Sequence, residues 1–401
     1  MKKVENRLNT PKPFKILVAP NSFKECADSV EISEMIKTSL FRLLPDEIKS
    51  NIEFSLKPIS DGGDGFLQVC QRNFGVEFLH FEISTPFNAD KFFCPVGYIL
   101  ESKTLFIESA EVLGLKIIPE EFRKPMMLSS KGLGDLLLQI YESVTTGIME
   151  VEKIVIGIGG TGTNDLGLGM MEAFGMELYD AQENRLEVLP LNFSRAVKIV
   201  VPEVPLPFKL EVILDVENPL LGIDGASLLF SEQKGATDEE AKEMEKGFSH
   251  MLDELEIDEE TQNKLSGAGG GLAAGLNLFF DADLKYASQF ISDDLKMHSD
   301  DSNADLVITG EGKLDQQTFL NKGAFIVVNE FAEKNVPITI LCGNSEGALP
   351  QIENLKVIEL SEYFDSVEES IKKIDQGIEI ACRKISKDII HHFTKKISGM
   401  N

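Results

Sequence analysis

Short apolar runs and amphipathic stretches alternate at the start of the chain. The run Phe14 to Ala19 predicts a buried strand, and apolar residues at helical spacing from Ile32 to Leu44 predict a helix. Asp28 and Glu31 stand where a capping box would begin that helix. A second strand is predicted from Ile52 to Pro58. This order of strand, helix and strand favours an open α/β sheet.

The same pattern returns near the other terminus. Strands are predicted there at residues 305–309, 337–342 and 356–360, and one long helix is predicted from about residue 367. Each of the first two strands runs into a glycine turn. The two chain ends therefore carry the same α/β signal.

The region between the two ends has shorter β runs and more glycine loops. The β runs cover residues 78–83, 92–98 and 105–108, and Thr237 with Glu240 forms a capping-box pattern before a helix predicted over residues 238–255. A chain of 401 residues exceeds the usual size of a single core. We therefore predict one domain from residues 1–75 and 285–401, and an inserted second domain from residues 76–284.

The amino-acid composition limits the kinds of partner that this protein is expected to bind. The chain has 66 acidic and 39 basic residues, and its net charge of −27 argues against nucleic acid or an anionic membrane as a partner. No apolar run reaches the roughly 18 residues of a membrane span, and the polar start lacks a signal-peptide pattern, so a cytoplasmic protein is expected. The five cysteines show no C-x-x-C spacing, so neither disulfides nor zinc are expected.

A glycine-rich loop follows the apolar run that begins at Ile154. Gly157, Gly159 and Gly162 fit the pattern G-x-G-x-x-G, and the loop ends at Asp165. Glycines let backbone N–H groups approach an anion, and a following helix would add its positive dipole end. Because Glu177 lies about twenty residues further on, an NAD-binding oxidoreductase is one alternative. A tight turn that binds no ligand is another.

Other polar loops follow predicted strands, at residues 20–24, 60–65 and 310–318. In an open parallel sheet, ligands bind beyond the carboxyl ends of the strands. No Walker A loop and no protein-kinase motif set is present. Phosphoryl transfer needs phosphate-binding groups, carboxylates for Mg²⁺ and a group that orients the acceptor, and the aspartates and lysines of these loops could supply them. Helix caps, Asx turns and solvated charges are the alternative roles of these side chains.

The chain resembles the bacterial glycerate kinase family of the type without a P-loop, over almost its whole length. The segments that carry the resemblance are, in chain order, Ala19–Lys24, Pro58–Gly65, Glu108–Ala110, Gly114–Leu115, Arg123–Pro125, Ser129–Asp135, Gly157–Asp165, Leu214–Leu220, Gln233–Ala236, Gly267–Gly271 and Thr309–Thr318.

The resemblance implies ATP-dependent phosphorylation of glycerate, with 2-phosphoglycerate as the usual product. It also implies a Rossmann-like parallel sheet domain built from both chain ends, and an inserted α+β domain that faces it across the active-site cleft. The chain departs from the family where Asn21 replaces an aspartate and where Asn321–Ala324 replaces Gly-Lys-x-Pro. These departures keep a third alternative open, a protein that binds a hydroxy acid without phosphorylating it.

We expect the following roles in a kinase that uses ATP and Mg²⁺. Lys24, Asp165 and Asp315 are the expected catalytic residues, with Lys24 balancing phosphoryl charge and Asp315 orienting the acceptor hydroxyl. Asp61 and Asp165 are expected to hold Mg²⁺. The residues expected to bind substrate or phosphate are Asn21, Ser22, Gly159, Gly160, Thr161, Gly162, Thr163, Asn164, Gly269, Gly270, Glu311, Lys313 and Lys322. A homodimer is left open.

Overall fold

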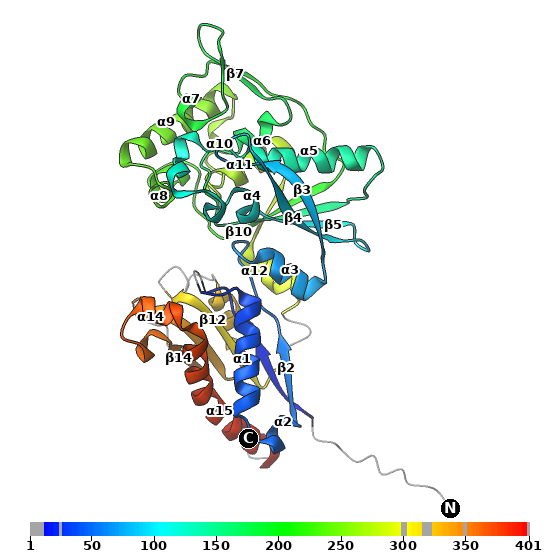
Figure 1. The fold of residues 1–401 in the computed structure, drawn as a ribbon, viewed down its shortest axis with the longest axis vertical. Coiled ribbons are helices and arrows are strands. Elements are labelled where there is room, and N and C mark those ends of the chain that lie inside the picture. Colours follow the sequence, from blue (N-terminus) through cyan, green and yellow to red (C-terminus); the bar gives the residue numbers. More distant parts are fainter. Residues whose placement is uncertain (1–11, 24–25, 298–302, 315–322, 348–350, 399–401) are drawn as a thin grey trace, which may run out of the picture. The chain divides into compact units, whose positions relative to one another are not determined.

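The computed structural model describes residues 12–23, 26–297, 303–314, 323–347 and 351–398. The chain divides into two compact units, Met1–Ile59 with Ile291–Asn401, and Ser60–Phe290 (Figure 1). We call them the terminal unit and the inserted unit. Residues 60–75, which the sequence analysis placed with the chain ends, belong to the inserted unit.

The terminal unit is built on a five-stranded sheet in which all neighbouring strands are parallel. The strand order is β14-β13-β12-β1-β2. Their bounds are β1 Phe14–Val18, β2 Ile52–Leu56, β12 Leu306–Leu314, β13 Ile338–Ser345 and β14 Leu355–Glu359. Segments from the two chain ends thus pair directly, with β1 beside β12. The predicted α/β class, with a parallel sheet drawn from both ends, is confirmed.

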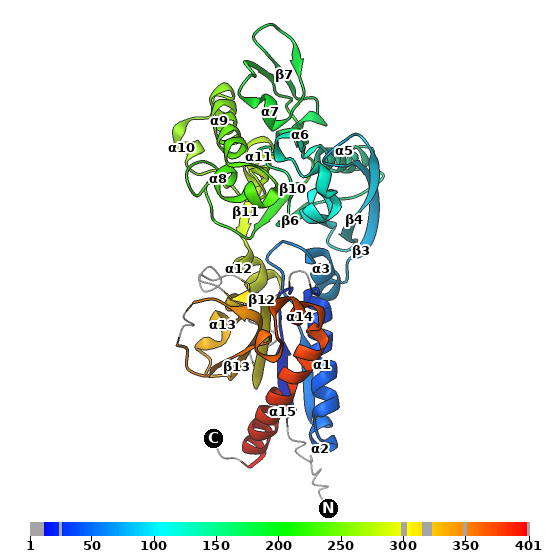
Figure 2. The ribbon, with the colours of Figure 1, turned by 60° about the vertical axis from the view of Figure 1, so that its left-hand side comes forward.

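Helices cover both faces of this sheet because its strands are apolar on both sides. Alternate residues such as Ile16 and Val18 join a core cluster with α1 and α15, whereas Leu17 is buried on the opposite face. Figure 2 shows α13 on the side of the sheet opposite α1 and α15, and α13 contacts β12 and β13. The helices are α1 Ser29–Leu43, α2 Asp46–Lys49, α13 Ala324–Ala332, α14 Val367–Lys372 and α15 Ile374–Ser398, with a 3₁₀ turn at Ser361–Tyr363.

Local capping signals predicted the helix starts well. Asp28 accepts a hydrogen bond from the Glu31 N–H and Glu31 reciprocates, which confirms the first capping box. The single final helix predicted from residue 367 is wrong, because α14 ends at Lys372 and α15 begins at Ile374. Lys373 leaves the helical region at ψ 34°, and no proline or glycine marks this break.

The inserted unit is built on a six-stranded mixed sheet of order β11-β10-β6-β5-β4-β3. Strands β11, β10, β6 and β5 run parallel, and β4 and β3 are antiparallel to their neighbours. The bounds are β3 Glu77–Ser84, β4 Lys91–Ile99, β5 Thr104–Glu108, β6 Lys153–Ile158, β10 Lys209–Leu214 and β11 Asp283–Tyr286. A small antiparallel sheet adds β7 Glu177–Tyr179, β8 Arg185–Leu186 and β9 Lys198–Val200.

Many short helices surround this sheet. The α-helices are α3 Phe66–Phe74, α4 Ser109–Leu113, α5 Lys131–Thr145, α6 Leu168–Glu172, α7 Pro190–Phe193, α8 Ala226–Phe230, α9 Asp238–Glu254, α10 Glu259–Gln262, α11 Leu272–Phe280 and α12 Ala287–Gln289. Short 3₁₀ turns lie at Leu115–Ile117, Glu120–Phe122, Pro125–Met127 and Glu232–Lys234, and one π-helical turn at Phe290–Asp294. The second capping box, Thr237 with Glu240 at the start of α9, is confirmed.

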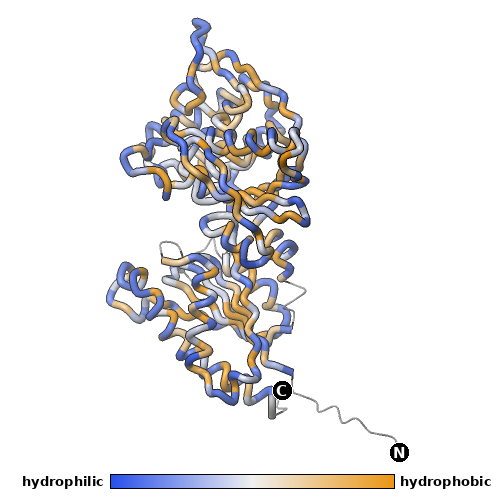
Figure 3. The backbone as a smooth tube through the Cα atoms, turned by 45° about the vertical axis from the view of Figure 1, so that its right-hand side comes forward, coloured by the Kyte–Doolittle hydropathy of each residue, from blue (hydrophilic) through white to orange (hydrophobic). Residues whose placement is uncertain are grey.

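Apolar strands form the interior of each unit, as the hydropathy colouring shows (Figure 3). In the inserted unit, one cluster of buried residues joins β4, β5 and β6 to helices α5 and α11. Helix α3 packs on the other side of the sheet, where the Phe74 ring stacks on Phe106 at 5.6 Å between centroids. None of the helices in the described part of the chain is long and apolar enough to span a membrane.

Residues 60–75 join the inserted unit through contacts with β5 and β6. A Cβ at Gly157 in β6 would lie 2.6 Å from the Gly62 carbonyl oxygen, so the two backbones touch. The buried Glu108 carboxylate accepts hydrogen bonds from the N–H groups of Gly65 and Leu67. Such long-range contacts leave no trace in local hydropathy, which is why the sequence placed the boundary later.

Candidate active site

Three glycine-rich segments of the inserted unit meet where β6 ends. We call residues 60–65, 157–165 and 267–271 together the glycine loop cluster. A Cβ at Gly159 would lie 2.6 Å from the Gly63 Cα, and one at Gly269 would lie 2.5 Å from Ile158 Cγ2. A Cβ at Gly270 would lie 2.3 Å from the Thr163 carbonyl oxygen. Only glycine permits these approaches, so the sequence composition of the three segments follows from their packing.

The segment 267–271 leads straight into a helix. Gly269, Gly270 and Gly271 have φ angles of +66°, +71° and +83°, and α11 begins at the next residue. Its N-terminal N–H groups therefore lie within the cluster. The sequence predicted such a helix after Asp165 instead. There the structure has α6, which starts at Leu168 and is five residues long, so its dipole adds little to the loop.

The N–H groups of the 157–165 segment differ in availability. The Gly159 N–H donates to Ser109 Oγ at 3.3 Å, and the Gly162 N–H donates to the Leu113 carbonyl at 2.7 Å. Within the described residues, the N–H groups of Thr163 and Asn164 have no acceptor. Thr163 Oγ1 and Asn164 Oδ1 are also buried without a partner there. Four unpaired polar groups on two adjacent buried residues are typical of a ligand site.

Asp165 lies fully inside the inserted unit. Its carboxylate accepts hydrogen bonds from the N–H groups of Ser130 at 2.6 Å, Gly167 at 3.2 Å and Gly169 at 3.2 Å. Burial raises the pKa of this carboxyl group, and the three hydrogen bonds oppose that rise. These contacts tie the start of α5 to the glycine segment. They favour a loop-anchoring role for Asp165, and its expected part in catalysis and Mg²⁺ binding stays a prediction.

Lys234 is a functional candidate that the sequence analysis did not select. It ends the 3₁₀ turn Glu232–Lys234, is 4% exposed, and is the only lysine or arginine buried among the described residues. Its Nζ donates to the Thr163 carbonyl at 2.7 Å and lies 3.4 Å from Thr161 Oγ1. A lysine in a polar turn is normally predicted to be a solvated surface charge. The one sequence signal for a functional role of Lys234 was the resemblance of Gln233–Ala236 to the family.

A second charged group holds the segment 60–65 in place. Lys116 Nζ lies 3.2 Å from Glu108, 2.6 Å from Glu111 and 3.2 Å from Asp64. The pKa of Glu108 is raised by burial, while Lys116 and the Leu67 N–H act in the opposite direction. Lys116 therefore neutralises carboxylates from three segments at one edge of the cluster.

Mg²⁺ needs few protein ligands in a kinase, since substrate phosphates and water complete its octahedron. Asp61 is partly exposed, and its Oδ1 accepts the Gly63 N–H at 3.3 Å. The described residues contain no group of three carboxylate, histidine or cysteine side chains placed to hold a metal. A site of one carboxylate with phosphates and water fits these residues, and a site made wholly of protein ligands does not.

The remaining expected residues belong to the terminal unit. Asn21 follows β1, and its N–H donates to the Gly310 carbonyl while its Oδ1 accepts the Ser22 N–H. Glu311 and Lys313 lie in β12, where Lys313 pairs with Glu346 at 2.9 Å. The ends of β1 and β12 thus bring Asn21 and Ser22 beside the Gly310 backbone. Lys24, Asp315 and Lys322 lie outside the described residues.

The geometry does not support the oxidoreductase alternative. Glu177, the expected ribose ligand, lies in β7 of the small sheet, where it pairs with Arg185 at 3.1 Å and accepts the Tyr179 hydroxyl. The third glycine of the pattern, Gly162, packs on Ile118 and opens no helix. The dinucleotide fingerprint requires a helix at that point.

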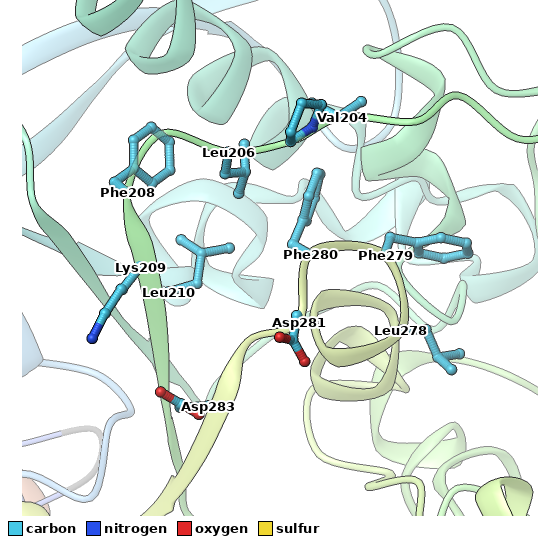
Figure 4. Close-up of a pocket in the computed structure, with 11 residues that line it drawn as sticks. Val204, Leu206, Phe208, Lys209, Leu210, Leu278, Phe279, Phe280, Asp281 and Asp283 are labelled. Atoms are coloured by element: carbon cyan, nitrogen blue, oxygen red, sulfur yellow. The ribbon is translucent and has the colours of Figure 1, made fainter.

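A pocket of about 500 Å³ lies elsewhere in the inserted unit (Figure 4). Aromatic and aliphatic side chains such as Phe208, Leu210 and Phe280 line it, with Asp281 and Asp283 at one side. It adjoins Lys209, the first residue of β10, whereas the glycine loop cluster follows the carboxyl ends of the parallel strands. The pocket is therefore separate from the candidate site.

Two α/β units and a cluster of glycine loops with unpaired buried N–H groups are the features expected of an enzyme that binds an anionic substrate without a P-loop. The profile of the glycerate kinase family matches residues 16–390, and the chain belongs to this family. It is thus a kinase, as the resemblance implied.

Individual relatives agree with this family assignment. The chain is 33% identical over 336 residues to a glycerate kinase of Haemophilus influenzae, covering 82% of this chain and 86% of the relative. It is 32% identical to the glycerate 2-kinase of Escherichia coli, covering 82% and 85%. A crystal structure of a candidate glycerate kinase 2 from Salmonella typhimurium LT2 superposes with a TM-score of 0.73 at 29% identity, covering 96% of this chain and all of that one.

Proposed function

We propose that this kinase transfers the terminal phosphoryl group of ATP to glycerate, with Mg²⁺, and releases 2-phosphoglycerate. Membership of the glycerate kinase family supports glycerate as the acceptor. The relative from Escherichia coli that is named glycerate 2-kinase supports the 2-phospho product. The observation that carries the proposal is the glycine loop cluster, in which the buried residues Thr163 and Asn164 keep unpaired N–H groups.

The cluster suits phosphoryl transfer because that reaction needs charge stabilisation rather than covalent help from the protein. The unpaired backbone N–H groups of Thr163, of Asn164 and of the α11 start would bind phosphate or carboxylate oxygens. Mg²⁺, when bound, would neutralise phosphate charge, with Asp61 as its protein ligand. We further propose that Lys24 and Lys322 balance phosphoryl charge and that Asp315 orients the acceptor hydroxyl.

A coupled assay of ADP release tests the proposal directly. The purified chain is given ATP with D-glycerate, L-glycerate or a panel of other small hydroxy acids, with Mg²⁺ or with excess EDTA. We expect Mg²⁺-dependent ADP release with one enantiomer of glycerate, and a product whose phosphorus signal matches 2-phosphoglycerate in NMR. Formation of 3-phosphoglycerate would correct the regiochemistry alone.

Two other results would redirect the assignment. Glycerate binding by calorimetry without any ADP release would favour a binding protein that has lost turnover. ADP release only with another hydroxy acid would replace the acceptor, and Asn21 would then be the first residue to examine, because it puts a neutral amide where the family has a carboxylate.

A further inference from the structure

Lys234 places a positive charge inside the inserted unit, against the glycine loop cluster. Its side chain is 4% exposed, and its Nζ donates to the Thr163 carbonyl at 2.7 Å. Burying an ammonium group costs several kcal/mol even after relaxation, unless nearby groups compensate it. A methionine would fill the same space without that cost. The cation therefore needs a reason beyond packing.

Two carboxylates act on this cation electrostatically. Burial lowers the pKa of Lys234 to about 8, and the negative charges of Asp165 and Asp215 oppose that fall. Asp165 in turn accepts the N–H groups of Ser130, Gly167 and Gly169, so its own position is fixed. While the amine is protonated, its hydrogen bond to the Thr163 carbonyl is charge-assisted and therefore stronger than one from a neutral amine.

The hydrogen bond from Lys234 fixes the orientation of one peptide group. In a trans peptide, the carbonyl of one residue and the N–H of the next point in opposite directions. With the Thr163 carbonyl held on Lys234 Nζ, the Asn164 N–H is directed away from the lysine. That N–H and the Thr163 N–H have no acceptor within the described residues, and both residues also carry a buried side-chain oxygen without a partner there.

We propose that Lys234 is a positioning residue, which holds the Thr163–Asn164 peptide so that its N–H binds an anionic oxygen of the substrate. The proposal rests on the proposed function, since it takes the ligand to be a phosphate of the nucleotide or the carboxylate of the acceptor. Lys234 itself does not touch the substrate. Without it, the peptide can turn over and direct a carbonyl oxygen at the anion, which would repel it.

A purely structural role makes a different prediction. If Lys234 only supported folding, its loss would lower stability and leave the kinetics of the folded enzyme unchanged. A positioning role predicts the reverse, because methionine replaces a buried charge with an apolar side chain of similar length, a change that is often neutral or stabilising.

The test compares Lys234→Met, Lys234→Arg and the control Lys264→Met. Lys264 is exposed, lies outside the glycine loop cluster and pairs with Glu260, so its replacement changes the net charge equally without removing a buried cation. We expect kcat/KM of Lys234→Met to fall about 100-fold, because displacement of a binding group typically has an effect of that size. Its melting temperature should stay equal to that of wild type. Lys234→Arg should recover part of the loss, and Lys264→Met should match wild type. The substrate whose KM rises identifies the anion that the peptide binds.

Two further measurements, the pH dependence of kcat/KM and the NMR signal of the Asn164 amide, would not change if Lys234 had only a structural role. Wild-type kcat/KM should fall above pH 8, because deprotonation of Lys234 removes the charge assistance of its hydrogen bond to Thr163, and Lys234→Met should not show this fall. The backbone amide signal of Asn164 should shift when inorganic phosphate or glycerate is added to wild type. The same additions should shift this signal only weakly in Lys234→Met.

Kinetics and pH profile of Lys234→Met equal to wild type would overturn the proposal. Should Lys234→Met fail to fold, an Asn164 amide in wild type that responds to neither ligand would overturn it as well. A wild-type chain that does not phosphorylate glycerate would refute the proposed function instead, and the amide titration would still decide the role of Lys234.

Discussion

Alanine at Gly270 tests the close contact between two glycine segments. Gly270 has φ +71°, and a Cβ there would lie 2.3 Å from the Thr163 carbonyl oxygen and 2.6 Å from Asn164 Oδ1. Carbon and oxygen atoms in contact are normally about 3.3 Å apart, so the segments must separate by roughly 1 Å. The contact strains the folded state and moves the proposed ligand-binding peptide.

Gly147→Ala is a matched control for the backbone strain. Gly147 has φ +74°, nearly the same angle, and a Cβ there would meet nothing within 4 Å. Alanine in the left-handed region costs about 1–2 kcal/mol at either position. The overlap at Gly270 should add about 1–3 kcal/mol, as overpacked interiors do. Only Gly270→Ala should therefore show the second cost.

Urea unfolding followed by far-UV circular dichroism measures both variants, since the chain has no tryptophan for fluorescence. The same preparations are assayed for kcat/KM. We expect Gly270→Ala to lose about 100-fold in kcat/KM, because a displacement of about 1 Å at reacting groups has that effect. Gly147→Ala should keep wild-type activity. Equal stability and equal activity of the two variants would refute the contact geometry of the cluster.

Three further predictions concern the buried charges. Glu108→Gln should lower the free energy of unfolding, measured by urea titration, by about 1–3 kcal/mol, because it leaves a buried N–H donor unpaired. Glu111 is a more exposed partner of Lys116, so Glu111→Gln should change that free energy by less than about 1 kcal/mol. Asp165→Asn should cost about 1–3 kcal/mol in thermal unfolding, since an amide cannot accept all three N–H groups. Because the folded-state pKa of Lys234, about 8, lies below its ordinary 10.5, wild type should gain about 3 kcal/mol relative to Lys234→Met as pH rises from below 8 to above 10.5. A flat pH dependence of that difference would show that the lysine is not desolvated.

Local signals in the sequence predicted the terminal unit well. Apolar runs identified β1 and β2, and the Asp28 and Glu31 pair identified the start of α1, because strands and caps depend on neighbouring residues. The break between α14 and α15 carries no such signal and was missed. The family assignment also followed from the sequence, since its motifs span most of the chain.

The contacts of the candidate site were harder to predict, because they depend on which segments meet. The sequence left Asp165 open as a metal ligand or a loop anchor, and the Ser130 N–H that favours the anchoring role comes from 35 residues away in the chain. The burial of Lys234 depends on its contact with Thr163, which lies 71 residues earlier in the chain. Sequence proximity gives no information on such a pair.

The substrate site proposed at the glycine loop cluster would account for the binding of acidic substrates by a strongly acidic protein. With a net charge of −27, the surface repels anions at long range, but salt screens that repulsion within about 8 Å at physiological ionic strength. The proposed backbone N–H groups would act at contact distance with the substrate, and the buried Lys234 charge that orients one of them lies in a low dielectric, where screening is weakest. Fixed N–H groups also need no reorganisation when charge moves during phosphoryl transfer. The glycines are then required because side chains would hold the backbone away from the ligand, and Lys234 is required because an unrestrained peptide of this kind could turn either way.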